Sequence, residues 1–398
     1  MKEGWEYKKL GEICDFRSGF AFKSNKFTKM GEPIIRISDI QNEEIDDSNL
    51  VYFDPKSYTE DLSKYLIYPD DILIAMSGGT TGKLGINTSK RTFYLNQRVG
   101  VFRENKKYLN HRYLYYFLHT KSEESLRIAA GAAQPNLSTA QIKSFIIPVP
   151  PLSQQQSIVD YLDSAFAKID AMKANAEKSL NEAKALFQAS LKEMLEPKEG
   201  WKEKKLGEMS EIQSGFAFKS TQFQKRGEFQ VIRMGNVRPG IIRYNESPVF
   251  IDSVDENTIE KSLLKVGDMI ITQTGSRNKR DYGFTVLIDK EKLLLNQRIA
   301  RIRVGNTITN KYLLYYSWTD YFRDQYFANE GGTVGQGNVG IDAIRYAVIS
   351  YPSLSEQQSI VATLDSLKSK VDKLQENYDK ISQECDALKQ AILRQVFE

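Results

Sequence analysis

The feature that most constrains this chain is an internal duplication. The segment at residues 4–27 returns at residues 200–223 with 15 of 24 positions identical. Further echoes follow in the same order in both halves: DDILIAMSGG and GDMIITQTGS, then LNQRVGVFR and LNQRIARIR, then PLSQQQSIVDYLDS and SLSEQQSIVATLDS. The whole chain is therefore two copies of one unit.

The size of the repeat predicts two domains. Solenoid repeats run about 20–50 residues, so a unit of about two hundred residues is a domain with an appendage. The length of 398 residues suits two cores, because single cores stop growing near about 250–300 residues. We expect globular domains at residues 1–150 and 198–352, followed by separate segments at 151–197 and 353–398.

Composition excludes several classes of protein. The net charge of +4 is a small excess of 55 basic over 51 acidic side chains, so any basic surface must be local. Cys14 and Cys385 lie far apart without a CxxC pair, which argues against a disulfide framework and a thiolate metal site. The sequence has no apolar signal-peptide core and no run near the roughly 18 apolar residues of a membrane span. We expect a soluble, cytoplasmic protein without membrane contact.

Within each copy, short β-branched runs alternate with Gly and Asn breaks, which predicts strands. The runs are PIIRIS, DILIAM, RVGVFR and FIIPVP in the first copy, and VIRMG, MIITQT, FTVLI and YAVISY in the second. Residues 110–120 and 310–319 predict helices. Each copy should therefore be a mixed α/β domain.

Proline followed by serine and glutamines marks the end of each globular part, in PVPPLSQQQ and YPSLSEQQ. Proline stops the preceding strand, and Ser153 or Ser355 can cap the next helix. Gln156 or Gln358, three residues further on, would complete a capping box. A long helix is predicted at each site.

Apolar residues in these helices recur in alternating steps of four and three, the spacing of a coiled-coil seam. The second helix has Ile360, Leu364, Leu367, Val371, Leu374, Tyr378, Ile381, Cys385, Leu388 and Ile392. The first has smaller side chains at the same spacing: Ile158, Leu162, Ala165, Ile169, Met172, Ala176, Ser179, Ala183, Leu186 and Ser190. Small residues leave room for larger ones, so we infer that the helices pair with each other. The alternatives are packing on their own domains or self-pairing into a dimer.

A helix of some 40 residues, at about 1.5 Å per residue, is a rod near 60 Å long. That length is comparable with one to two turns of B-DNA at about 34–36 Å each. The helices are therefore suited to act as a spacer between two reading surfaces.

The ordered repetition of the GW…KKLGE…SGFAFKS openings, the LNQR turns and the QQSIV helix entries resembles the specificity subunits of type I restriction-modification systems. The resemblance covers essentially the whole chain. It implies that residues 1–150 and 198–352 are target recognition domains, each reading one half of a bipartite sequence in double-stranded DNA. It also implies that the helices form an antiparallel spacer that sets the gap between the half-sites.

The same resemblance implies the partners. Two methyltransferase subunits and restriction subunits would bind the chain and carry the S-adenosylmethionine, ATP and magnesium chemistry. The chain itself would hold no cofactor and act as a non-catalytic specificity subunit.

Polar loops that differ between the copies are the candidates for DNA contact. Residues 77–83 and 274–280 follow matching strands but carry different side chains, SGGTTGK and TGSRNKR. Arginine suits guanine edges, asparagine suits adenine, and lysine and hydroxyls suit phosphates. The candidates are Arg277 and Arg280 for guanine, Asn278 for adenine, and Lys83, Lys279, Thr80 and Thr81 for phosphate, with Ser77 and Ser276 in the same loops. The alternative is a solvated loop without DNA contact.

Other repeated polar and aromatic positions are weaker candidates. Matching strands begin at Gln97-Arg98 and Gln297-Arg298. The identity of these residues favours structural hydrogen bonding, with DNA-backbone contact as the alternative. The alternating phenylalanines Phe20, Phe22, Phe216 and Phe218 favour the core over base stacking. Gln134 and Asn136, matched by Gln336 and Asn338, lie in glycine-rich loops and are candidates for DNA contact or domain orientation.

Catalytic motifs are missing from the sequence. GGTTGKL lacks the first glycine and the final hydroxyl residue of a phosphate loop. His111 and His119 have no nearby cysteine or acid pair to complete a metal site. Neither a methyltransferase Asn-Pro-Pro-aromatic motif nor a nuclease centre stands out. Two alternatives stay open, a coiled-coil tether for two protein ligands and a single-chain nuclease.

Overall fold

The computed structural model describes residues 4–130, 136–252, 254–328, 330–333 and 335–398. The chain divides into two compact units, one of residues 1–175 with 379–398 and one of residues 176–378. Each unit contains one globular part and a stretch of each long helix. The sequence instead predicts separate segments for the helices, at residues 151–197 and 353–398. Each globular part therefore shares its unit with two helical stretches that are distant in the sequence.

Two mixed sheets form the globular part of the first unit. Their strands are β2 (Cys14–Ser18), β3 (Phe27–Thr28), β4 (Glu32–Ile35), β5 (Ile40–Gln41), β6 (Glu44–Ile45), β7 (Val51–Phe53), β8 (Leu66–Ile67), β9 (Ile72–Ala75), β10 (Leu84–Ile86), β11 (Phe93–Leu95) and β12 (Val99–Glu104). The larger sheet has the order β2-β12-β9-β10-β6-β5, and the other has the order β3-β7-β4-β11-β8. Strand β4 pairs with β11, and β6 with β10, in parallel. All the runs predicted as strands in this copy are confirmed.

A separate ribbon joins β1 (Glu6–Lys9) to β13 (Ile146–Val149). Short helices complete the first unit: α1 (Leu10–Ile13), α2 (His111–Thr120), α3 (Ser122–Ala130) and α4 (Thr139–Lys143). Helix α2 starts where predicted, because the Asn110 side chain accepts the Tyr113 N–H at 3.1 Å.

The second unit repeats this plan. Its strands are β14 (Lys202–Lys205), β15 (Ser210–Ser214), β16 (Phe229–Ile232), β17 (Val237–Arg238), β18 (Ile241–Ile242), β19 (Phe250–Ile251), β20 (Leu263–Leu264), β21 (Met269–Thr272), β22 (Thr274–Ser276), β23 (Thr285–Leu287), β24 (Leu293–Leu295), β25 (Ile299–Val304), β26 (Gly331–Thr333), β27 (Gln336–Asn338) and β28 (Val348–Tyr351). The orders β15-β25-β21-β23 and β19-β16-β24-β20 match the β2-β12-β9-β10 and β7-β4-β11-β8 parts of the first unit's sheets. Strands β17 and β18 form a sheet of their own, and β14 pairs with β28. The second unit adds a small sheet, β22-β27-β26.

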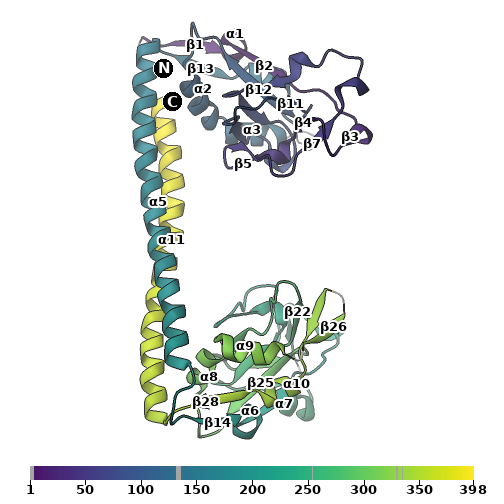
Figure 1. The fold of residues 1–398 in the computed structure, drawn as a ribbon, viewed down its shortest axis with the longest axis vertical. Helices are drawn as coiled ribbons and strands as arrows, with labels where there is room; N and C mark the ends of the chain where they lie inside the picture. The colour runs from purple at the N-terminus through teal and green to yellow at the C-terminus, as the bar shows by residue number, and fades with distance from the viewer. Residues whose placement is uncertain (1–3, 131–135, 253, 329, 334) are drawn as a thin grey trace. The chain divides into compact units, whose positions relative to one another are not determined.

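The helices of the second unit are α6 (Leu206–Met209), α7 (Glu256–Ser262), α8 (Asn310–Tyr316), α9 (Asp320–Phe327) and α10 (Ile341–Tyr346), and Figure 1 shows α9 beside the strands of this unit. The helix predicted for residues 310–319 ends at Tyr316. Its predicted last residue instead caps α9, because the Thr319 hydroxyl accepts the Phe322 N–H at 3.3 Å.

The two long helices are α5 (Leu152–Leu195) and α11 (Leu354–Phe397). The predicted caps Ser153 and Ser355 are wrong by two residues, since both lie inside the first turn. The cap of α11 is Ser353, whose hydroxyl accepts the Glu356 N–H at 3.3 Å. None of the helices in the described ranges combines the length and apolar composition needed to cross a membrane.

Within each unit, stretches of α5 and α11 lie side by side and antiparallel. Polar pairs join them in this order: Lys389 with Asp170 at 2.6 Å, Lys173 with Asp386 at 3.4 Å, and Lys184 with Gln375 at 2.8 Å. Residue numbers rise along one helix as they fall along the other. The predicted pairing of the two helices with each other is therefore confirmed in both units.

The predicted seam is partly correct. Buried or half-buried seam residues include Ile158, Leu162, Ile169, Ile360, Leu364, Leu367, Val371 and Leu374. Met172, Leu186 and Leu388 are wrong, because their side chains are 58%, 57% and 48% exposed. Phe187, one residue further along α5, is buried in place of Leu186.

The error has a physical cause. Two consecutive steps of four residues, through Ile169 in α5 and through Cys385 in α11, replace the expected alternation of four and three. A second step of four residues in place of three rotates the stripe of buried residues around the helix and locally unwinds the supercoil. Both phase changes lie in the first unit, where the Cys385 thiol is 3.7 Å from the Ile169 carbonyl oxygen.

The long helices also complete the cores of the globular parts. In the first unit, the Phe397 ring packs on Tyr113 and Phe117, with ring centroids 5.0 and 5.9 Å apart. In the second unit, Phe187 from α5 packs against Tyr315 and belongs to the main core. Each core is therefore closed by a helical stretch that is distant in the sequence.

Candidate nucleic-acid interface

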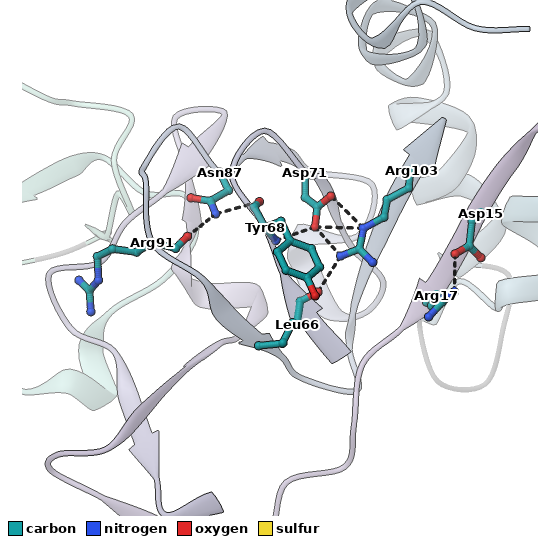
Figure 2. A network of polar contacts seen from close by, with 8 residues as sticks. All are labelled: Asp15, Arg17, Leu66, Tyr68, Asp71, Asn87, Arg91 and Arg103. Atoms are coloured by element: carbon teal, nitrogen blue, oxygen red, sulfur yellow. Dashed lines mark hydrogen bonds and ion pairs between the residues drawn. The ribbon is translucent and has the colours of Figure 1, made fainter. Parts of the chain in front are cut away.

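A partly buried ion pair holds the start of one strand in each globular part, β9 in the first unit and β21 in the second. In Figure 2, Arg103 of β12 donates to Asp71 from Nε at 3.0 Å and from Nη2 at 2.6 Å, and Nη2 also donates to the Leu66 carbonyl at 2.7 Å. The bonds to Asp71 raise the pKa of Arg103 above its usual value. Arg303 holds Asp268 in the same way, at 2.7 and 2.8 Å. The ion pairs therefore fix strands β9 and β21 at their starts. The loops that follow the other ends of these strands extend from a fixed framework.

In the first unit, the loop after β9 is a short 3-10 turn (Gly78–Thr80). The Thr81 hydroxyl donates to the Gly78 carbonyl at 2.8 Å, and Ser77 pairs with Asn136 through an isolated β-bridge. Ser77 and Thr81 are buried, whereas Lys83 is exposed and has no ion-pair partner within the described residues. Among the DNA contacts predicted in this loop, Lys83 is therefore the positively charged side chain that is exposed to solvent. Thr80 is half-buried, and its hydroxyl has no hydrogen-bond partner in the described part of the chain.

In the second unit, the equivalent loop leaves the small sheet at β22. The exposed Asp281 accepts the Ser276 N–H at 2.6 Å. The Arg277 guanidinium is occupied: Nε lies 3.4 Å from a Glu330 carboxylate oxygen, and Nη2 donates to the Gly331 carbonyl at 2.9 Å. Guanine contact by Arg277 would require this arrangement to open. The side chains of Asn278, Lys279 and Arg280 are exposed.

The identical Asn-Gln-Arg turns lie beside these loops. The Met76 N–H donates to the Arg98 carbonyl at 2.8 Å, and the Gln273 N–H donates to the Arg298 carbonyl at 2.9 Å. Both arginine side chains are exposed. The backbone therefore has the structural role favoured by the sequence, while the guanidinium groups remain accessible.

Sequence reasoning missed one more arginine in each copy. Arg233 and Arg298 line a hollow of about 530 Å³ together with Asn296 and Gln297. The Arg233 Nε and Asn296 Oδ1 atoms are buried and have no hydrogen-bond partner in the described part of the chain. The repeated Ile-Arg of PIIRIS and VIRMG could have revealed this position.

The corresponding arginine of the first unit, Arg36, is neutralised. Its Nη2 lies 3.2 Å from an oxygen of Asp39, a residue that is Asn236 in the second copy. The Asp39 side chain accepts the backbone N–H of Arg36 at 2.9 Å, and the Asn236 side chain accepts that of Arg233 at 3.0 Å. The loop geometry is thus shared, but its net charge differs between the copies.

The glycine-rich loops also reach this region. Gln336 and Asn338 are exposed on β27, which pairs with β22. Gly337 lies between them because a β-carbon there would stand 2.1 Å from the Tyr282 hydroxyl oxygen. Gln134 lies outside the described residues. The second copy therefore adds two polar side chains to its loop cluster.

The structure also bears on the predicted core role of the phenylalanines and on the question of a metal site at the histidines. Phe22 and Phe218 are buried, and Phe20 and Phe216 pack beside them, which agrees with a core role. Groups of three or more metal-ligating side chains do not occur among the described residues.

Comparison with known proteins bears on the whole chain. The model of the family described as type I restriction modification DNA specificity domain matches residues 2–182 and 198–383. This chain belongs to that family. The two matches coincide with the two copies of the repeat, so each copy is one specificity domain.

Two relatives of this specificity-family chain span most of its length. The type I restriction enzyme EcoKI specificity subunit of Escherichia coli K12 is 24% identical over 424 residues, covering 100% of this chain and 89% of the relative. A putative MjaX specificity subunit of Methanocaldococcus jannaschii is 27% identical over 395 residues, covering 92% and 87%.

Solved structures support the fold of the specificity subunit. A chain from a type I R-M system studied for its complex assembly and conformational transition has a TM-score of 0.75 at 18% identity, covering 99% of this chain and 97% of that chain. The HsdS subunit from Thermoanaerobacter tengcongensis has a TM-score of 0.55 at 18% identity, with the same coverage. The predicted fold class is confirmed: two mixed α/β domains in tandem, with long helix α5 between them in the sequence.

Proposed function

We propose that this specificity subunit reads a bipartite target in double-stranded DNA, one half with each domain. The observation that carries the proposal is the repeated loop cluster: one framework, built twice, presents different side chains at equivalent positions. A reader of two unlike half-sites needs this combination of constant support and variable contact surface.

The division of labour follows from DNA chemistry. Phosphate contacts fix a protein on the duplex without reading sequence, and contacts to base edges specify it. Arg98 and Arg298 are identical and exposed, so we assign them to the phosphate backbone. Asn278, which is exposed and differs between the copies, is assigned to a base edge of the second half-site, and the exposed Lys83 and Lys279 are assigned to phosphates beside the half-site that each domain reads.

The proposed complex places catalysis elsewhere. The relatives are specificity subunits of restriction enzymes, so we infer that this chain is non-catalytic. Two methyltransferase subunits and restriction subunits would bind it. S-adenosylmethionine, ATP and magnesium would be held by those partners.

The decisive experiment is genome-wide mapping of modified adenines. Cells would express the methyltransferase encoded beside this chain, with and without the chain. A split motif, with two defined halves around a fixed gap, is expected only when the chain is present. A stable complex that yields no motif would contradict the proposal and favour the tether instead.

A domain exchange tests the assignment of half-sites. Replacing residues 1–150 with the first domain of another specificity subunit should change one half of the motif and leave the other intact. A simultaneous change in both halves would rule out independent reading. The matched control is the reciprocal exchange of residues 198–352, which should alter the opposite half.

A further inference from the structure

Two arginines in the second unit share one aromatic ring. The Arg280 guanidinium carbon lies 4.9 Å from the centroid of the Phe327 ring, and that of Arg323 lies 5.2 Å from the same centroid. Tyr282 and Tyr326 pack edge-on against this ring, with centroids 5.1 and 5.0 Å away. Guanidinium groups are attracted to the face of such a ring. The ring therefore holds two positive charges at the edge of the polar loop.

The acidic groups of this region are engaged elsewhere. Asp281 accepts the Ser276 N–H, and Glu330 lies against Arg277 and accepts the Tyr282 hydroxyl. Within the described residues, Arg280 and Arg323 have no carboxylate within ion-pair distance. Asp320 and Asp324 flank Arg323 on α9, but neither forms an ion pair with it. Asp320 and Asp324 therefore offset the Arg323 charge only in part, since its pKa stays below the usual value.

The arrangement carries an electrostatic and a conformational cost. Burial, and then the neighbouring Arg280 charge, lower the pKa of Arg323. Arg280 also has a positive φ of 45°, a region that side-chain-bearing residues rarely adopt. Its N–H closes the turn on the Ser276 carbonyl at 2.9 Å, which fixes this conformation. Costs of this kind cluster at functional sites, where a ligand can offset them.

We propose that Arg280 and Arg323 form a binding site for one phosphate of the DNA backbone beside the second half-site. This inference rests on the proposed function and replaces the assignment of Arg280 to a guanine edge. A phosphodiester supplies the missing negative charge and two oxygens that match the guanidinium fork. Guanine offers only uncharged acceptors, which leave the repulsion between the arginines in place.

Among the described residues, the pair of arginines on one phenylalanine ring occurs in the second unit. The corresponding helix of the first unit, α3, has Glu123 and Glu124 in its first turn, and Glu123 pairs with Arg394 at 3.2 Å. The first polar loop, residues 77–83, contains a single cation, Lys83. We therefore expect the two domains to contact the DNA phosphate backbone with different residues.

The test uses the full chain in complex with its methyltransferase. Binding is measured by fluorescence anisotropy, from about 50 to about 200 mM salt, on a duplex with the mapped motif and on one with both halves scrambled. The variants are Arg280→Gln, Arg323→Gln and the double substitution. Lys204→Gln is the matched control, because it removes one exposed positive charge of the same unit on β14. Arg280 is exposed, so its substitution tests the site even if Arg323→Gln fails to fold.

Each arginine substitution should weaken binding to both duplexes by the same factor, roughly tenfold. The double substitution should reduce the salt slope by about one, which corresponds to one lost phosphate contact. Affinities and slopes equal to those of Lys204→Gln would overturn the site. So would a loss confined to the specific duplex with relaxed preference at one base, which would return Arg280 to base reading. If the unsubstituted complex does not distinguish the duplexes, the proposed function itself fails.

Discussion

Substitution of Arg103 by leucine should destabilise the first domain far more than the same substitution at Arg17. Both arginines form ion pairs in the region of Figure 2, but their surroundings differ. The Arg103–Asp71 pair has side chains that are 29% and 9% exposed. The side chains of the Arg17–Asp15 pair, 2.8 Å apart, are each 46% exposed. The comparison therefore sets a partly buried ion pair, whose arginine also donates to the Leu66 carbonyl, against an exposed one.

The magnitude follows from what remains around Asp71. Without Arg103, the carboxylate keeps the Tyr68 N–H, which donates at 2.7 Å, and loses its countercharge. Removing one partner of a buried pair costs about 3–5 kcal/mol, and the partial exposure of Arg103 places the expected loss near the lower limit, about 3 kcal/mol. Exposed pairs contribute about 0–1 kcal/mol, so Arg17→Leu should be nearly neutral.

Hydrogen exchange measured by mass spectrometry resolves the two domains. About 3 kcal/mol corresponds to roughly 150-fold faster exchange of the best-protected amides in β9 and β12. Peptides from β21 and β25, where Arg303 and Asp268 form the equivalent pair, serve as an internal control and should not change. If Arg103→Leu and Arg17→Leu accelerate exchange to a similar small extent, the argument from burial is refuted.

Three further predictions concern buried side chains. Phe187→Ala should destabilise the second unit by about 3–5 kcal/mol in urea melts, whereas Leu186→Ala should stay within about 0.5 kcal/mol; equal losses would contradict the observed helix phase. Burial raises the pKa of Cys14 to about 12, so iodoacetamide at pH 8 should modify Cys14 only after unfolding, and rapid labelling of the folded chain would disprove this. Burial lowers the pKa of His119 below 6.5, so the unfolded state takes up the proton first and the first unit should lose stability as pH falls below about 6.5; superimposable pH profiles for His119→Gln and the unsubstituted chain would count against it.

Much of the fold could be predicted because the relevant information is local. The run DILIAM became β9, all of whose residues are buried, and the alternating phenylalanines entered the core. The repeat also predicted that both copies share one plan. The set of residues buried in the seam of the long helices was harder to predict, because heptad counting through Ile169 assumes a regular alternation of four and three that the packed helices do not keep.

The candidate site was predictable in place but less so in detail. The sequence located both polar loops, yet Ser77, which is buried, forms a bridge with Asn136, a residue far along the chain. The engagement of Arg277 with Glu330 is equally non-local. Arg323 could not be connected with the loop at all, because its proximity to Arg280 depends on how α9 packs.

The packing of Phe397 into the first core has a consequence for biosynthesis. A ribosome that adds about 5–20 residues per second needs on the order of 15 to 60 s to make the roughly 280 residues between Tyr113 and Phe397. Throughout that interval, the nascent first domain lacks the α11 residues that cover its apolar side chains. The domain synthesised first is therefore completed last, and it exposes a surface for chaperones while the second domain is still emerging.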